Sequence, residues 1–165
     1  MGNVIDYLVQ YGDQAFAEQA FCDVDVLILA QLSYFDFGSA VPTIAQHKKS
    51  VTLEEIDRTA DLSAVFADKW YGENNRKLWN ALLAGRRFRT MRCNYYRERI
   101  EEEQEAQFGA VTFFPEGCEP VVAFRGTDDS VVGWKEDFNM SFLSPVPSQK
   151  DAVRYIDTTV QRSEG

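Results

Sequence analysis

A change in the spacing of the apolar residues, near residue 87, constrains the fold of this chain more than any other feature. Ahead of it, Ile28, Leu32 and Phe35 fall at i, i+4 and i+7, the spacing of one face of a helix. Behind it, apolar and polar side chains alternate from Phe88 to Tyr95, as they do in a strand. A chain with both patterns must pack helices against a sheet, so we expect the α/β class.

The N-terminal part carries further helix signals. Thr52 and Glu55 form the pattern of a capping box, which predicts a helix that begins there and leads toward Trp70. A second helix is predicted over residues 75–84, because its leucines fall on one face. Gly85 follows it directly and is placed to act as its C-cap.

The C-terminal part contains a predicted hairpin. Residues 107–114 and 120–124 have the composition of strands, and Pro115 to Cys118 supplies turn residues between them. We therefore expect an antiparallel hairpin within a larger sheet. The run from Arg97 to Glu105 is dominated by charge, and we interpret it as a solvated helix turn or loop.

A final helix is predicted over residues 148–162, with one apolar stripe that needs a sheet to cover it. In an α/β fold such a helix returns the chain to a parallel strand, whereas here the sequence stops at Gly165. We therefore expect an interrupted sheet. The predicted division is a helical N-terminal or cap region, 1–86, and the first part of an incomplete core, 87–165.

The composition limits the kinds of partner that the chain can bind. The formal charge of −9 argues against nucleic acid and anionic membrane surfaces, because both attract a basic face. The longest apolar run, Val26 to Ala30, is far too short to span a membrane, and the N-terminus lacks a secretory signal, so we expect a cytoplasmic protein. Cys22, Cys93 and Cys118 form no C-x-x-C pair, and we expect free thiols, no metal and no cofactor.

The segment from Val121 to Asp128 is the most informative about chemistry. A buried strand ends at Gly126, and the hydroxyl residue Thr127 follows at once. In an acyl-transfer enzyme such a turn can direct a backbone N–H and a side-chain hydroxyl at the carbonyl oxygen that becomes negative. One such donor lowers the barrier by about 2.7–4 kcal/mol. The alternative is that Thr127 is an ordinary turn residue after a core strand.

At this segment the sequence resembles the class 3 lipases, a branch of the α/β-hydrolase fold, and more closely their uncharacterised bacterial lipase-like relatives. The Phe-Arg-Gly-Thr turn is similar to their oxyanion loop, and the downstream Trp-x-x-Asp strengthens the match. The resemblance spans most of the chain, and the residues that carry it are 25–37, 86–88, 107–113, 124–129, 133–140, Gln149, Ala152 and Tyr155.

The resemblance implies roles for single residues. Thr127 would be the oxyanion donor, while Gly126 would permit close backbone approach or an unusual φ and, with Asp128, would belong to the binding site. Arg125 and Asp137 would be structural, as an ion pair that holds the loop. The implied substrate is a carboxylic ester or a lipid.

The sequence also departs from the family pattern. None of its serines lies in a G-x-S-x-G motif. The only histidine, His47, precedes the sheet, which is the wrong chain order for that triad, and we expect it in a surface loop. We therefore expect the N-terminal portion of a lipase- or esterase-like serine hydrolase that has the oxyanion loop, lacks the nucleophile and catalytic histidine, and is inactive alone.

Two other functions stay open. The chain is alternatively a non-catalytic interaction module, whose unfinished sheet edge pairs with a second copy or with a separate catalytic half. A weaker alternative is a complete enzyme with an unrelated mechanism based on aspartate and arginine side chains.

Overall fold

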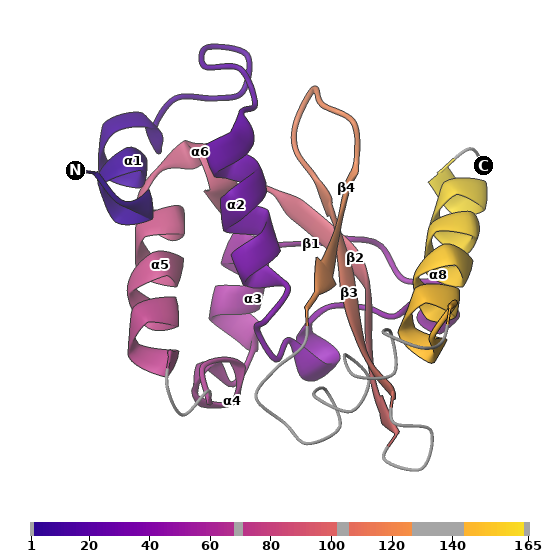
Figure 1. Ribbon diagram of the computed structural model, residues 1–165. Coiled ribbons are helices and arrows are strands. Elements are labelled where there is room, and N and C mark those ends of the chain that lie inside the picture. Colours follow the sequence, from indigo (N-terminus) through magenta and orange to yellow (C-terminus); the bar gives the residue numbers. More distant parts are fainter. Residues whose placement is uncertain (1, 68–70, 102–105, 127–143, 164–165) are drawn as a thin grey trace.

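The computed structural model describes residues 2–67, 71–101, 106–126 and 144–163. It is built in three layers, with a sheet between two layers of helix (Figure 1). The helices α1 to α6 lie on one side of the sheet, and α8 (Pro147–Ser163) lies on the other. The chain therefore mixes helix and strand, as expected for the α/β class.

The sheet has four strands in the order β1-β2-β3-β4, and every neighbouring pair is antiparallel. The strands are β1 (Val51–Thr52), β2 (Arg92–Glu101), β3 (Ala106–Phe114) and β4 (Val121–Arg125). The hairpin predicted from the sequence is confirmed as β3 and β4. Its connection contains a turn in which the Cys118 N–H donates to the Pro115 carbonyl (3.2 Å), with Gly117 at a φ of 71°. Such a positive φ favours glycine.

The helices of the first layer are short, and they are α1 (Val4–Tyr11), α2 (Asp23–Leu32), α3 (Leu53–Thr59), α4 (Leu62–Val65), α5 (Gly72–Ala84) and α6 (Arg86–Arg89). Single turns of 3-10 helix lie at Gly38–Ala40 and Ile44–Gln46. The predicted strand from Phe88 was wrong at its start, because Phe88 belongs to α6 and β2 begins at Arg92.

The capping box at the start of α3 is confirmed. The Thr52 Oγ1 accepts from the Glu55 N–H (3.2 Å), and the Glu55 carboxylate accepts from the Thr52 N–H (2.7 Å). The helix is shorter than expected, however. Ala60 is extended, and the Asp61 carboxylate caps a new helix, α4, by accepting from the Ser63 N–H (3.0 Å).

The main hydrophobic core lies between the first helical layer and the sheet. The apolar stripe predicted in α2 is part of it, since Ile28, Leu32 and Phe35 are all fully buried. Trp79 of α5 is also buried, and its indole N–H donates to Asp57 (2.8 Å). Strand residues such as Val111 complete this core, so residues from both predicted regions share it.

Gly85 ends α5, as predicted, but for a different reason. Its φ of −110° is not left-handed. A Cβ at this position would instead lie 2.1 Å from the Gly12 carbonyl oxygen, which also accepts from the Arg87 N–H (2.9 Å). Glycine is thus required by the close approach of two chain segments.

The predicted stripe of α8 covers the other face of the sheet. Tyr155 is fully buried, and its hydroxyl contacts the Thr112 Oγ1 (2.8 Å) and donates to the Tyr95 carbonyl (2.9 Å). Phe108 and Ala110 of β3 pack in the same small core. One member of the stripe was wrongly placed, since Ile156 is 42% exposed.

A β-bulge in β2 decides which side chains face each layer. Asn94 pairs with Thr112 and Arg97 with Ala110, so β2 contains one residue more than β3 over this interval. Tyr95 takes a left-handed φ of 62° there. The extra residue reverses the alternation, and Arg97 and Arg99 turn toward α8 instead of the main core.

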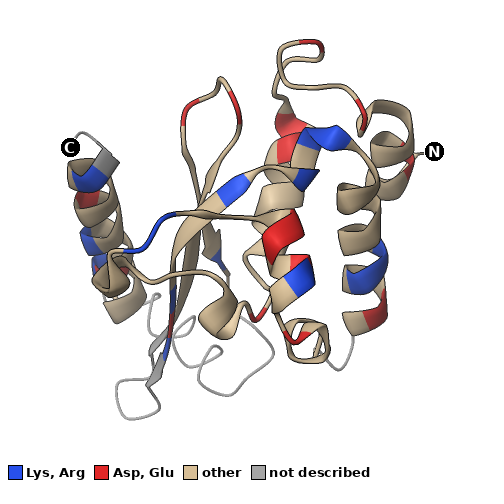
Figure 2. Ribbon diagram, turned by 180° about the vertical axis from the view of Figure 1, so that it is seen from behind, with Lys and Arg blue, Asp and Glu red and all other residues tan. Residues whose placement is uncertain are grey.

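The prediction of a loop or helix turn from Arg97 to Glu105 was wrong for residues 97–101, which are strand; residues 102–105 lie outside the described residues. The charges of Arg97, Glu98 and Arg99 are tolerated because each of these three side chains has a partner. Arg99 and Arg97 form ion pairs with Asp151 of α8 (2.5 and 3.6 Å), and Asp151 is buried. Figure 2 shows these basic segments of β2 beside α8.

Candidate functional site

The candidate site is the turn that follows β4. Phe124, Arg125 and Gly126 are described, and Gly126 is exposed. Thr127 and Asp128, the predicted oxyanion donor and its neighbour, lie outside the described residues. The described residues of the site come from β4, β2 and β3 and from the segment just beyond α2.

Arg125 is the last residue of β4 and lies flat against β3. It pairs in register with Gly109, and a Cβ on Gly109 would lie 3.1 Å from the Arg125 Nε. Its Nη1 contacts the Glu98 carboxylate (2.7 Å), and only 10% of the side chain is exposed. The predicted partner Asp137 lies outside the described residues. Arg125 Nε and Nη2 are buried without a hydrogen bond to any described residue.

Glu98 connects this arginine to a buried phenol. The Tyr96 hydroxyl donates to the Glu98 carboxylate (3.2 Å), and the Tyr96 ring packs edge-on against Phe37 (5.9 Å between centroids). Burial, together with the charges of Glu98 and Asp36, raises the pKa of Tyr96 far above its ordinary value. The phenol therefore stays protonated and fixes Glu98, which in turn fixes Arg125 beneath the turn.

Gly126 is held from the helical side. Its N–H donates to the Tyr34 hydroxyl oxygen (3.2 Å), across 92 residues of chain. A Cβ on Gly126 would lie 2.8 Å from the same oxygen, so the backbone at this glycine approaches the phenol closely. Its φ lies outside the left-handed region, so the unusual φ considered from the sequence was wrong.

Sequence reasoning missed both Tyr34 and Glu98. Tyr34 lies just beyond α2, within residues 25–37 that carry the resemblance, and nothing in its spacing points to residue 126. Glu98 lies in the charged run from Arg97 to Glu105, which was interpreted as a solvated helix turn or loop. An alternating pattern of strand residues on both sides of that run was the signal that could have found it.

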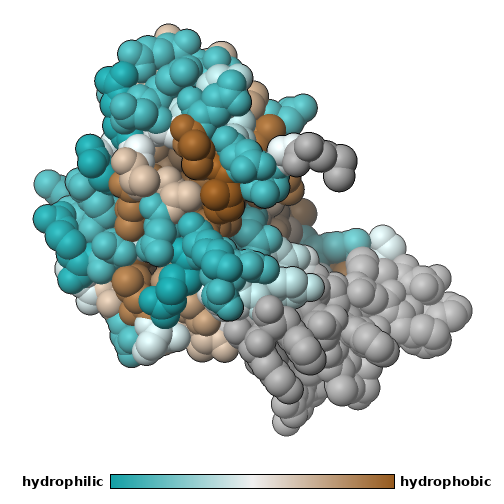
Figure 3. Space-filling view, turned by 90° about the vertical axis from the view of Figure 1, so that its left-hand side faces the viewer, coloured by the Kyte–Doolittle hydropathy of each residue, from teal (hydrophilic) through white to brown (hydrophobic). Residues whose placement is uncertain are grey.

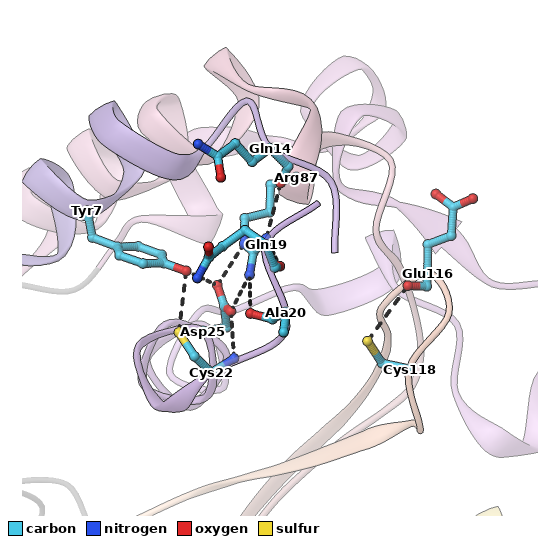
Figure 4. Close-up of polar contacts among 9 residues, drawn as sticks. All are labelled: Tyr7, Gln14, Gln19, Ala20, Cys22, Asp25, Arg87, Glu116 and Cys118. Atoms are coloured by element: carbon cyan, nitrogen blue, oxygen red, sulfur yellow. Dashed lines mark hydrogen bonds and ion pairs between the residues drawn. The ribbon is translucent and has the colours of Figure 1, made fainter. Parts of the chain in front are cut away.

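Two residues that carry the resemblance, Asp25 and Arg87, form a buried ion pair (Figure 4). Arg87 and Asp25 contact each other at 2.6 Å, and the Asp25 carboxylate also accepts from the Tyr7 hydroxyl (2.9 Å). Burial alone would raise the pKa of Asp25, but the hydrogen bonds from Arg87, the Cys22 N–H and Tyr7 lower it below its ordinary value.

Arg87 uses its remaining donors on backbone. Its two terminal nitrogens donate to the carbonyls of Gln14, Gln19 and Ala20 (2.8–3.2 Å), and the guanidinium lies 4.2 Å from the centre of the Phe16 ring. All these contacts organise the segment between α1 and α2. The donors of Arg87 are thus used within the protein, and the role of this cluster is structural.

His47 is exposed, as predicted, and its Nδ1 lies 3.2 Å from the Arg162 Nη1. The three cysteines are free thiols, also as predicted. Burial raises the pKa of the Cys93 thiol, which keeps that sulfur protonated. Within the described ranges, no group of three or more histidine, cysteine, aspartate or glutamate residues could hold a metal ion. None of the described helices is both long and apolar enough to cross a membrane.

The first helical layer carries an open groove of about 600 Å³ between α1, α2 and α5. Apolar side chains gather on this face (Figure 3). Leu27 lines the groove and is 57% exposed. The Gln31 amide donates to Asn75 (3.1 Å) there. The groove is thus mostly apolar, and its polar lining residues are Asn3, Gln31, Asn74, Asn75 and Lys77.

These features define a mixed helix and sheet protein whose antiparallel hairpin ends in a braced Arg-Gly turn. Residues 82–165 match the Mbeg1-like family model, just over half of the chain, and the chain belongs to the Mbeg1-like family. The match includes β2, β3, β4 and α8, and therefore the whole strand side of the candidate site. Neither a curated protein nor a solved structure matches the chain.

Proposed function

We propose that this chain is the N-terminal portion of a lipase- or esterase-like serine hydrolase and contributes its oxyanion turn. The observation that carries the proposal is the fixed position of Gly126, whose N–H is bound by Tyr34 while Arg125 beside it is held by Glu98. An oxyanion site must be rigid before the reaction, because donors that need no reorganisation stabilise the developing charge best.

In this proposal Thr127 supplies a hydrogen bond to the carbonyl oxygen of a carboxylic ester or lipid, and Gly126 and Asp128 line its site. A serine hydroxyl attacks the carbonyl carbon, a histidine takes its proton, and the alcohol leaves with that proton. Water then releases the acid from the acyl-enzyme by the same route. The serine and the histidine come from polypeptide outside these 165 residues.

The two parts of the chain then have separate roles. Residues 1–86 act as a helical cap over the substrate, and 87–165 form the first part of an α/β-hydrolase-like core. The apolar groove between α1, α2 and α5 supports an apolar substrate, because its walls suit an acyl chain better than a charged group.

Hydrolysis of p-nitrophenyl butyrate tests the proposal on two proteins. The chain alone should show no turnover, and a fluorophosphonate probe should label none of its serines. The chain continued by its downstream coding sequence should turn over, and Thr127→Ala should lower kcat by about 10²–10³-fold while Thr127→Ser retains most activity. A labelled serine in the isolated chain, or a downstream sequence without G-x-S-x-G, would overturn the proposal.

The second candidate is a non-catalytic interaction module. It is favoured by the position of β4 at the edge of the described sheet, with apolar Val153 of α8 59% exposed on the neighbouring layer. Such edges invite pairing with another chain. Analytical ultracentrifugation separates the candidates, since this module should dimerise with a concentration-dependent mass that Val153→Asp reduces. A folded monomer at all concentrations contradicts it.

A further inference from the structure

We propose that the Tyr34 hydroxyl is a second hydrogen-bond donor to the ligand oxygen at the Gly126 turn. The inference rests on the proposed function for the identity of that oxygen, the carbonyl oxygen of an ester. It assigns a role to a residue from the first helical layer, so the cap would contribute directly to the oxyanion site instead of only covering it.

The position of Tyr34 is fixed by the core on both sides of it. Ser33 is 3% exposed, and its hydroxyl donates to the Ala30 carbonyl (2.7 Å) at the end of α2. Phe35 is fully buried and packs edge-on against Phe66 (5.4 Å between centroids). With its two neighbours held inside, the side chain of Tyr34 is directed outward and is 42% exposed.

Gly126 and Tyr34 fit each other closely. The phenol oxygen lies 3.2 Å from the Gly126 nitrogen and would be 2.8 Å from a Cβ at that position. Any residue other than glycine would therefore displace the hydroxyl. The pairing joins an element of the helical layer to the end of β4 at the residue that immediately precedes Thr127.

The hydroxyl proton of Tyr34 is available for a further hydrogen bond. A tyrosine hydroxyl has one donor proton and lone pairs that accept. The Gly126 N–H occupies a lone pair, and the described part of the chain offers no acceptor for the O–H. Accepting one hydrogen bond also polarises the O–H and strengthens it as a donor. A partly exposed, fixed phenol at the turn can thus donate to an oxygen that arrives from solution.

The test uses the 165-residue chain and methyl butylphosphonate, a monoanion with a tetrahedral head. Binding is followed through the Gly126 amide in ¹⁵N NMR spectra, so no turnover is required. Two variants distinguish a hydrogen bond that Tyr34 donates to the ligand from the hydrogen bond by which Tyr34 holds Gly126. Tyr34→Phe removes both hydrogen bonds, whereas O-methyltyrosine at position 34 keeps the acceptor oxygen for Gly126 and removes only the donor proton. Tyr11→Phe is the control, because the Tyr11 hydroxyl lies outside the groove and accepts an exposed hydrogen bond from Gln10.

We expect saturable binding to the wild-type chain and to Tyr11→Phe, and binding weakened by about tenfold or more in both position-34 variants. An unshifted Gly126 amide in the O-methyltyrosine protein shows that the turn is intact. Equal affinity of that protein and the wild type, or no response of Gly126 in the wild type, would overturn the inference. The ester hydrolysis assay judges the proposed function separately, because it depends on the downstream serine.

Discussion

The guanidinium of Arg87 lies 2.6 Å from the carboxylate of Asp25, and neither side chain has exposed surface. The pair joins the start of α2 to α6 across 62 residues. Removing one partner of a buried ion pair leaves an uncompensated charge in the core, which destabilises far more than the loss of a surface pair.

Replacing Arg87 by methionine should therefore lower the free energy of unfolding by about 3–5 kcal/mol. The neighbouring Arg86 is the matched control, because its ion pair with Glu18 is half-exposed. Arg86→Met should cost only about 0–1 kcal/mol. Urea denaturation followed by circular dichroism measures both values, and similar losses in the two variants would contradict the structural role of Arg87.

The same pair predicts the response to acid. The pKa of Asp25 is lower in the folded chain than the ordinary 3.8. Its contribution to stability is therefore present above that ordinary value and is lost as the pH falls through the folded value. As the pH falls below that ordinary value, the wild type should lose stability more steeply than Asp25→Asn, which has no such proton to bind. Parallel slopes in thermal melts would contradict this assignment.

The contact between Gly126 and Tyr34 predicts a coupling between two substitutions. Gly126→Ala places a methyl group against the phenol oxygen and should cost about 1–3 kcal/mol. In the Tyr34→Phe background the oxygen is gone, so the same substitution should cost less. A double-mutant cycle with Tyr71→Phe in place of Tyr34→Phe should be additive. An additive result for Tyr34 as well would show that the two residues do not contact.

Tyr155 should anchor α8 to the sheet. Tyr155→Phe leaves the partly buried Tyr95 carbonyl without this donor, at a cost of about 1–3 kcal/mol. Because the contact lies between α8 and β2, hydrogen exchange should accelerate in α8 more than in α2. Tyr11→Phe is the control, since its hydroxyl accepts only an exposed hydrogen bond from Gln10. Uniform acceleration across both helices would contradict a local role.

Local signals predicted the parts of the fold that depend on neighbours in sequence. The capping box of Thr52 and Glu55 and the hairpin of β3 and β4 involve residues a few positions apart, so spacing was enough to find them. The strand at residues 97–101 was missed because Asp151, the partner of Arg97 and Arg99, comes some fifty residues later. A run of charged residues predicts solvent exposure only when no residue distant in the sequence supplies an opposite charge.

Of the residues of the candidate site, too, only those with a local signal could be recognised from the sequence. The glycine at position 126 was recognised from the sequence because it ends a strand, a local property. Its partner Tyr34 was not, because the hydrogen bond spans 92 residues and requires the cap and the sheet to be packed first. Positions of this kind become visible only when the tertiary structure is known.

The bulge at Tyr95 lets β2 hold one residue more than the stretch of β3 that it pairs with. If every residue of β2 were kept and the pairing ran without the bulge, Arg97 and Arg99 would point into the main core, and Glu98 would face the carboxylate of Asp151. Deleting the extra residue, by contrast, would leave Arg97 opposite Ala110 and on the side of α8. Homologous chains that lack the bulge should accordingly be one residue shorter here, so that a gap of a single residue in an alignment falls at the bulge.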